Sequence, residues 1–233
     1  MKTVVIGDVH GLDTWRAIVD RHKEEHIVFM GDYCDPYEEF SSEELIENLA
    51  EIIELKRQNM GRVTLLLGNH DMHYIYPEFP QGTRFDAFIA MRLRALIEDN
   101  RELFQFAYQE GKWLFTHAGI SAGWWHGDFK GDADKSVADQ LNGAQGEQLS
   151  AMFQCGMERG GNHRYGGIFW ADKDELLLPL HGVHQVVGHT RVERVIASNL
   201  SEDTSVMFCD CLAHGCYGMV DTESGMMSKL YAE

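Results

Sequence analysis

The sequence has few of the features that would set it apart from ordinary globular proteins. Its 233 residues include only four prolines, and no repeat, low-complexity tract or linker divides the chain. No apolar run approaches the roughly 18 residues of a membrane helix, and the apolar run at the N-terminus is too short for a signal-peptide core. We therefore expect a single domain over residues 1–233, located in the cytoplasm, with no membrane partner.

Cysteine is scarce and irregularly spaced. The five cysteines are an odd number and include no C-x-x-C pair, which excludes a typical disulfide framework or zinc ribbon. Three of them, Cys209, Cys211 and Cys216, lie close to His214. This spacing is not a recurrent structural-zinc pattern, so we expect reduced, mostly buried thiols.

Positive charge is also in short supply. Lys and Arg number 20 against 37 Asp and Glu, which gives a net charge of −17. Such a chain repels a long polyanion, so no long nucleic acid is expected as a partner. A small phosphorylated ligand is still compatible if bound metal ions supply local positive charge. The oligomeric state is left open.

The first third of the chain contains three short aliphatic runs, at 3–7, 27–31 and 63–68, each ending in glycine. They are typical of buried strands. Between them, apolar spacing predicts helices over 12–23 and 42–58, the second capped by Ser42. This β-α-β-α-β beginning indicates an α/β protein.

The rest of the chain predicts a helix over 85–99, strands over 103–108 and 113–116, and short strands at 185–187, 195–197, 205–209 and 218–220. The segment 123–167 is rich in Gly, Asp, Asn and Gln. It predicts a cap-like insertion with one helix, over 134–153. Trp124 and Trp125 in this segment are either pocket walls or core residues.

Polar residues directly follow each of the three early strands. The sequences are GDVHG at 7–11, GDYCD at 31–35 and GNHD at 68–71, and two later apolar runs end at His117 and His189, each beside a glycine. Ligands of α/β sheets bind at the carboxyl ends of strands, so we expect these turns to converge. Asp8 and His10, two residues apart, offer one ion a hard oxygen and an imidazole nitrogen.

These five motifs resemble the signature of the calcineurin-like metallophosphoesterases, which reads GDxHG, GDxxD, GNH(D/E), HxG and GH. The resemblance is closest to the phosphoprotein-phosphatase branch, which contains Ser/Thr protein phosphatases and bacterial diadenosine tetraphosphatases. It covers about residues 2–210, and five short motifs in order are far more specific than any one alone. It implies an α-β-β-α fold, a β-sandwich flanked by helices, with a cap-like insertion.

The resemblance also implies two divalent metal ions, with Mn²⁺ expected and Fe or Zn as alternatives. Asp8 and His10 would hold the first ion, and Asp32 would bridge both. The second ion would bind Asp32 and three further residues, Asn69, His117 and His189. In such centres, a hydroxide that bridges the two ions attacks the phosphorus.

Further roles follow from the same resemblance. His70 would protonate the departing alkoxide, and Asp71 would orient the His70 ring. Asp35 is expected to support the site or cap a helix. His73 and His184 lie near motif residues and are candidates for lining the pocket.

One departure concerns the phosphate clamp. Protein phosphatases of this branch carry an arginine in GDxVDRG, but this chain reads GDYCDPY at 31–37. Arginine grips phosphate through paired hydrogen bonds. Arg159 and Arg164, which precede a segment at 168–172 resembling LLWSDP, are therefore the candidate substrate-binding residues.

The sequence thus predicts a metal-dependent phosphatase that hydrolyses phosphomonoesters, phosphoserine and phosphothreonine of proteins included. One alternative is a nucleotide anhydride or phosphodiester hydrolase such as a symmetrical diadenosine tetraphosphatase. A second is a non-catalytic docking module that binds metal. The module predicts degraded ligand positions, and the predicted ligand positions are intact.

Overall fold

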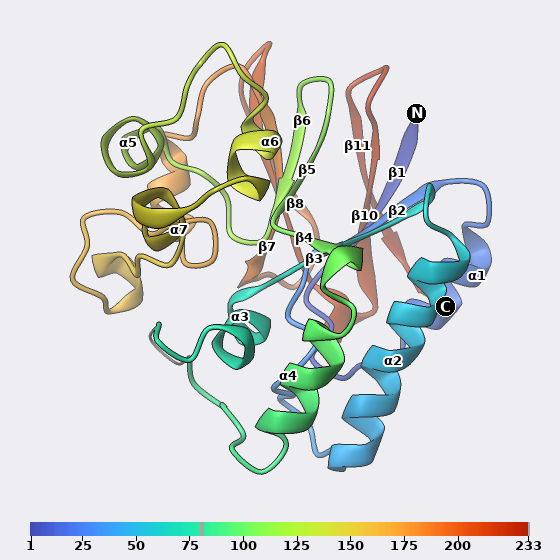
Figure 1. The fold of residues 1–233 in the computed structure, drawn as a ribbon. Helices are drawn as coiled ribbons and strands as arrows, with labels where there is room; N and C mark the ends of the chain where they lie inside the picture. Colours follow the sequence, from blue (N-terminus) through green and yellow to red (C-terminus); the bar gives the residue numbers. More distant parts are fainter. Residues whose placement is uncertain (80–81, 233) are drawn as a thin grey trace.

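Two β-sheets form the centre of the computed structural model, which describes residues 1–79 and 82–232 (Figure 1). The first sheet has six strands, and β1 to β4 run parallel to one another. In spatial order its strands are β11 (Met226–Tyr231), β10 (Cys216–Asp221), β1 (Lys2–Ile6), β2 (His26–Phe29), β3 (Val63–Leu66) and β4 (Phe104–Gln105). Strand β10 is antiparallel to both of its neighbours, β1 and β11.

The second sheet has five strands, of which β6, β7 and β9 are parallel. In spatial order they are β5 (Ala107–Glu110), β6 (Trp113–Thr116), β7 (His184–Arg191), β9 (Thr204–Asp210) and β8 (Ile196–Ser201). The antiparallel strands β5 and β8 lie at its two edges. Both sheets therefore present the carboxyl ends of several parallel strands, where loops can gather side chains.

The alternation of side chains along β1 explains the two-layer packing. Val4 and Ile6 belong to the large core on the helical side of the first sheet. Val5 points the opposite way and packs in a second core with Val186 and Met207 of the other sheet. Because successive residues of a strand face opposite sides, an unbroken aliphatic run is apolar on both faces and must be covered on both.

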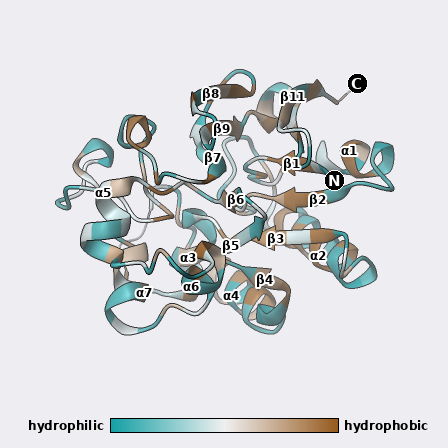
Figure 2. Cartoon of the chain, turned by 90° about the horizontal axis from the view of Figure 1, so that it is seen from above, coloured by the Kyte–Doolittle hydropathy of each residue, from teal (hydrophilic) through white to brown (hydrophobic). Residues whose placement is uncertain are grey.

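Three helices cover the outer face of the first sheet (Figure 1). They are α1 (Trp15–Arg21), α2 (Ser42–Gln58) and α4 (Ala90–Glu98). Figure 2 shows hydrophobic and hydrophilic residues alternating along α2, whose Leu49 and Ile52 are buried. The helix cap is Ser41, one residue before the predicted Ser42, because Ser41 and Glu44 form a reciprocal capping box.

The segment predicted as an insertion lies on the other side of the molecule, beyond the second sheet (Figure 1). It contains α5 (Ala122–Trp124), α6 (Val137–Asn142) and α7 (Gly146–Met152). The prediction of a single helix over 134–153 is wrong, because the helix is interrupted between α6 and α7, and Gly146 has a φ of +55°. Trp124 and Trp125 are buried against Phe129, so they are core residues.

Other differences from the prediction arise at short elements. The strand predicted over 103–108 is divided, with β4 in the first sheet and β5 in the second. A short helix, α3 (Asn69–Ile75), and the last strand, β11, were not predicted. The predicted α-β-β-α arrangement is confirmed. No helix among the described residues is long and apolar enough to cross a membrane.

Candidate metal centre

The predicted metal ligands come from strand ends in both sheets, and the structure brings them into one cluster. Two follow β1, one follows β2, and one begins α3 directly after β3. The other two follow β6 and lie in β7. They are Asp8, His10, Asp32, Asn69, His117 and His189.

A first group of donors contains Asp8, His10 and Asp32, all of which are buried. One ligand atom from each lies within 4.8 Å of the others. His10 Nε2 is 3.7 Å from Asp32 Oδ2, and its Nδ1 is 2.8 Å from the carbonyl oxygen of Cys34. Carboxylate oxygen and imidazole nitrogen suit a divalent cation.

A second group shares Asp32 with His117 and His189. His117 Nε2 lies 3.4 Å from Asp32 Oδ2 and 2.9 Å from Asn69 Oδ1. His189 Nδ1 lies 2.9 Å from the same amide oxygen. Asp32 is therefore placed between two donor sets, as the bridging role predicted for it requires.

The side-chain atoms of this site are better suited to binding cations than to forming hydrogen bonds with one another. His117 Nδ1 lies 2.8 Å from the carbonyl oxygen of Met30, so it carries the hydrogen. Burial lowers the pKa of both His10 and His117 and keeps these rings neutral. Their Nε2 lone pairs then face the Asp32 carboxylate with no proton to share, and His189 Nδ1 lies against the amide oxygen of Asn69. Cations among these atoms would satisfy them.

Three carboxylates crowd this pocket. Burial and the neighbouring Asp210 raise the pKa of Asp8, and burial and Asp32 raise the pKa of Asp210 to about 7. Burial alone would raise the pKa of Asp32, but His117, His70 and His10 together hold it well below its usual range. Divalent cations would relieve this repulsion. Asp210 was not predicted as a site residue, although its place at the end of β9 was the available signal.

The turns that carry the donors are held in unusual backbone conformations. Six of the described non-glycine residues have positive φ, and four of these are at the site: His10 (45°), Asp32 (52°), Asp35 (58°) and His189 (59°). Such conformations cost energy and persist where the surroundings enforce them. At Gly68 a Cβ atom would collide with the Asp32 carboxylate, so only glycine fits there.

The partner of the His70 ring is Asp35 and not Asp71. His70 Nδ1 is 2.8 Å from Asp35 Oδ2, and His73 Nε2 is 2.7 Å from the same oxygen. The Tyr74 hydroxyl donates to the other oxygen of Asp35. Burial would lower the pKa of His70, but the charges of Asp32 and Asp35 outweigh it and raise that pKa. His70 is thus buried beside the metal donors, with its ring held by Asp35.

The predicted orienting role of Asp71 is corrected by its hydrogen bonds. Its carboxylate accepts from the backbone N–H groups of Asp32 (2.8 Å), Tyr33 (2.9 Å) and Gly68 (2.8 Å). These bonds turn Asp71 away from the His70 ring and tie two ligand-bearing turns together. Asp71 therefore supports the backbone of the site.

The two predicted substrate arginines differ in position. Arg159 lines the metal pocket, a cavity of about 350 Å³. Its Nε lies 2.8 Å from Asp172 Oδ2, and Nη2 donates to Thr190 at 2.7 Å. Arg164 is exposed over the ring of Tyr165, 5.1 Å from its centre, and does not line this pocket within the described part of the chain.

The two other candidate histidines, His73 and His184, lie in different parts of the structure. His73 belongs to the network of Asp35 described above. His184 begins β7, at the strand end remote from the metal donors, where it bonds Ser205 at 2.9 Å and lies beside Trp113. His184 is therefore structural.

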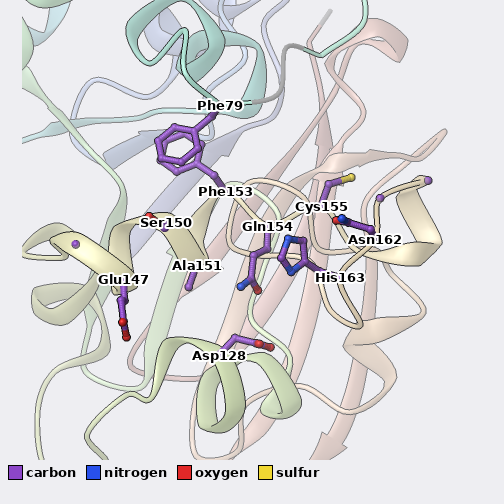
Figure 3. A pocket seen from close by; sticks show the side chains of 13 residues that line it. Phe79, Asp128, Glu147, Ser150, Ala151, Phe153, Gln154, Cys155, Asn162 and His163 are labelled. Atoms are coloured by element: carbon purple, nitrogen blue, oxygen red, sulfur yellow. The ribbon is translucent and has the colours of Figure 1, made fainter.

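A second, wider pocket of about 1100 Å³ adjoins the metal pocket (Figure 3). Cys155 lines both cavities. The wide pocket is formed largely by the segment after β6, and Figure 3 shows Asp128, Glu147 and Gln154 around it with the paired rings of Phe79 and Phe153 at one end. Its described lining contains no lysine or arginine.

Solved structures share this fold. A cold-active protein-tyrosine phosphatase of a psychrophilic Shewanella species has a TM-score of 0.61 and 21% identity, over 98% of this chain and 80% of that one. A Saccharomyces cerevisiae protein serine/threonine phosphatase with similarity to human phosphatase PP5 gives 0.56 and 15%, over 100% and 80%. A putative diadenosine tetraphosphatase gives 0.51 and 13%, over 100% and 94%. At these identities the likeness concerns the fold.

The sequence was also compared with families and with curated proteins. No curated protein matches the chain. Residues 1–193 match the family described as calcineurin-like phosphoesterase. Because this match covers most of the chain and includes every residue of the two donor groups, the protein belongs to the calcineurin-like phosphoesterase family of metal-dependent enzymes.

Proposed function

We propose that the enzyme hydrolyses phosphomonoesters of alcohols, with phosphoserine or phosphothreonine in a polypeptide as the substrate. The proposed cofactor is a pair of Mn²⁺ ions. Asp8 and His10 would hold one ion, Asn69 and His117 with His189 the other, and Asp32 both. When bound, two such ions would neutralise phosphoryl oxygens and lower the pKa of a water molecule.

The observation that carries this proposal is the His70 ring, which is hydrogen-bonded to Asp35 through Nδ1. An alkoxide is a poor leaving group, so breaking an alkyl phosphate ester needs a proton at the bridging oxygen. A phosphate leaving group, released from an anhydride, needs that proton far less. His70 lines the metal pocket, and its raised pKa suits a proton donor at neutral pH.

The wide pocket supports a large leaving group. The metal pocket of about 350 Å³ has room for a phosphate and the atoms next to it. The adjoining pocket of about 1100 Å³ would accept the chain that carries the phosphate. Its carboxylates, Asp128 and Glu147, and the absence of lysine and arginine from its described lining favour a neutral or basic polypeptide over a further run of phosphates.

A second candidate is hydrolysis of a nucleotide anhydride or phosphodiester, as in a symmetrical diadenosine tetraphosphatase. The observation that favours it is a pair of arginines, Arg84 and Arg191, at the rim of the metal pocket. The non-catalytic docking module is set aside, because the chain belongs to a family of enzymes.

The experiment compares four substrates after Mn²⁺ loading: a phosphoserine peptide, p-nitrophenyl phosphate, bis(p-nitrophenyl) phosphate and diadenosine tetraphosphate. We expect the two monoesters to be preferred. His70→Asn should reduce peptide turnover by about 100-fold or more, and p-nitrophenyl phosphate turnover less, since p-nitrophenolate leaves without a proton. Asn69→Ala is the control for the metal site.

Two results would overturn the proposal. One is a preference for diadenosine tetraphosphate over both monoesters. The other is an equal loss of peptide and p-nitrophenyl phosphate turnover in His70→Asn with metal content intact, since His70 would then not act on the leaving group.

A further inference from the structure

Two arginines lie against one tyrosine at the edge of the metal pocket. The guanidinium carbon of Arg84 is 4.1 Å from the centre of the Tyr37 ring, and that of Arg191 is 4.2 Å from it. Both guanidinium groups therefore lie against the same aromatic ring. Each stack is a cation–π contact that fixes the arginine side chain.

Tyr37 joins this stack to the metal donors. Its ring meets His10 edge-on, with ring centres 4.8 Å apart. Tyr37 lines the metal pocket and also a smaller pocket beside it, which Arg191 lines as well. Thr83, the residue before Arg84, lines the metal pocket. The two positive charges therefore lie at the rim of the catalytic cavity.

Neither arginine has a carboxylate partner among the described residues. The arginines of the described chain within ion-pair distance of a carboxylate are Arg16, Arg57, Arg92, Arg94 and Arg159. Arg84 donates one hydrogen bond, from Nη1 to the carbonyl oxygen of Pro36 at 3.1 Å, and has a positive φ of 68°. Strain of this kind concentrates at functional sites. Asp8, Glu38 and Asp210 line the smaller pocket beside Arg191, but none lies within ion-pair distance of its guanidinium group. In a chain of net charge −17, two guanidinium groups without such a partner at a pocket rim suit an anionic ligand.

Arg84 lies against the position at which protein phosphatases carry an arginine. This chain has Pro36 at that position, and Arg84 donates a hydrogen bond to the carbonyl oxygen of Pro36. Arg159 already lies inside the metal pocket, with its charge offset by Asp172. Arg191 lines the smaller pocket, which shares Asp8, His10, Tyr37 and Asp210 with the metal pocket, so an anion on Arg191 would lie close to the scissile phosphate.

We propose that Arg84, Tyr37 and Arg191 form a binding site for a second phosphate of the substrate, next to the phosphate that is cleaved. The inference rests on the proposed function only in placing the scissile phosphate in the metal pocket. The enzyme would then select substrates in which two phosphates lie close together.

The test compares binding of pyrophosphate and orthophosphate to the Mn²⁺-loaded protein by calorimetry, at a fixed free Mn²⁺ concentration. We expect pyrophosphate to bind about tenfold more tightly or better, as one or two charge-assisted hydrogen bonds would give. Arg84→Gln and Arg191→Gln should each remove most of this difference. Tyr37→Phe should keep it, and Tyr37→Ala should lose it, because the stack needs the ring and not the hydroxyl.

Arg16→Gln is the matched control, since Arg16 also stacks on an aromatic ring, that of Trp15, but belongs to α1. Equal binding of the two anions by the unmodified protein, or a difference that survives in Arg84→Gln and Arg191→Gln, overturns the inference. Because binding needs no turnover, loss of the proposed function would leave this result readable.

Turnover then identifies the source of the second phosphate. In both arginine variants, kcat/KM is measured for a doubly phosphorylated peptide, its singly phosphorylated counterpart and diadenosine tetraphosphate. A selective loss for the doubly phosphorylated peptide assigns the site to phosphopeptides, and a selective loss for the dinucleotide assigns it to nucleotides. An equal loss for all three contradicts a second-phosphate site.

Discussion

The two cavities of this enzyme are built in different ways. The metal pocket is made from short turns at strand ends of both sheets, and its side chains are buried and bonded from turn to turn, as Asp71 shows. The wide pocket is made largely from one continuous segment, and several of its polar side chains, such as Asp128 and Glu147, are exposed. On the proposed function, the strand ends would hold the catalytic groups, and the substrate would be recognised by a separate segment that can vary without disturbing them.

The largest expected effect is on the residue that both donor groups share. Asp32→Asn removes a negative charge from each group and leaves two buried histidines facing an amide. We expect activity to fall by about 1000-fold or more and the bound metal to fall well below two ions per chain. Metal analysis and turnover measure both effects. Retention of two ions with full activity would contradict the shared role.

The second-largest effect distinguishes the role of the Asp35 carboxylate from that of the Asp71 carboxylate. Asp35→Asn should reduce kcat by about 100-fold with little change in KM or metal content, because His70 loses the carboxylate that orients its ring and helps to raise its pKa. Asp71→Asn should instead lower the melting temperature, because an amide accepts backbone N–H groups less well. The reverse pattern, with catalysis lost in Asp71→Asn alone, would restore Asp71 as the partner of His70.

These two residues show how far the sequence predicts the site. The ligand positions were predictable because each follows a strand, and strand ends of parallel sheets meet at one edge. The choice between Asp35 and Asp71 was not predictable, because it depends on the direction in which each carboxylate points. Asp71 lies in the first turn of α3, and its carboxylate points toward three backbone N–H groups. Sequence neighbours in a helix do not face each other, which is why adjacency to His70 misled.

The wide pocket was less predictable for a similar reason. Its composition indicated loops, but the break at Gly143 to Gln145 and the burial of Trp124 depend on tertiary packing. Likewise, nothing local to Arg84, Tyr37 or Arg191 indicates that the three side chains stack, since they are brought together from separate turns.

A smaller effect concerns the metal pocket without its ions. The folded-state pKa of Asp210 is raised to about 7, so this group stabilises the metal-free fold at low pH and its contribution is lost as the pH rises through 7. At pH 6, Mn²⁺ at about 100 times its Kd should add about 2.7 kcal/mol, or roughly 5–10 °C in melting temperature, and the same Mn²⁺ concentration is used at pH 8. We expect the increment to be larger at pH 8 than at pH 6, as thermal denaturation would show.

The matched control for this measurement is Asp210→Asn. It should reduce the loss of metal-free stability between pH 6 and pH 8, because the amide does not titrate. If the metal-free protein were equally stable at pH 6 and pH 8 with Asp210 present, the crowding of carboxylates in the metal pocket would be refuted.

The smallest effect probes the wide pocket. Glu147→Gln removes an exposed carboxylate from its lining, so a phosphopeptide with a neighbouring lysine should lose an attraction worth about two- to fivefold in KM. Turnover of p-nitrophenyl phosphate should stay the same, because that substrate fits in the metal pocket. Glu158→Gln, an exposed acid of the same segment that does not line the pocket, is the control. If both variants or neither changed the KM of the basic peptide, the peptide would be bound outside the wide pocket. The proposed division of roles, with catalytic groups at the strand ends and peptide binding by the segment after β6, would then be wrong.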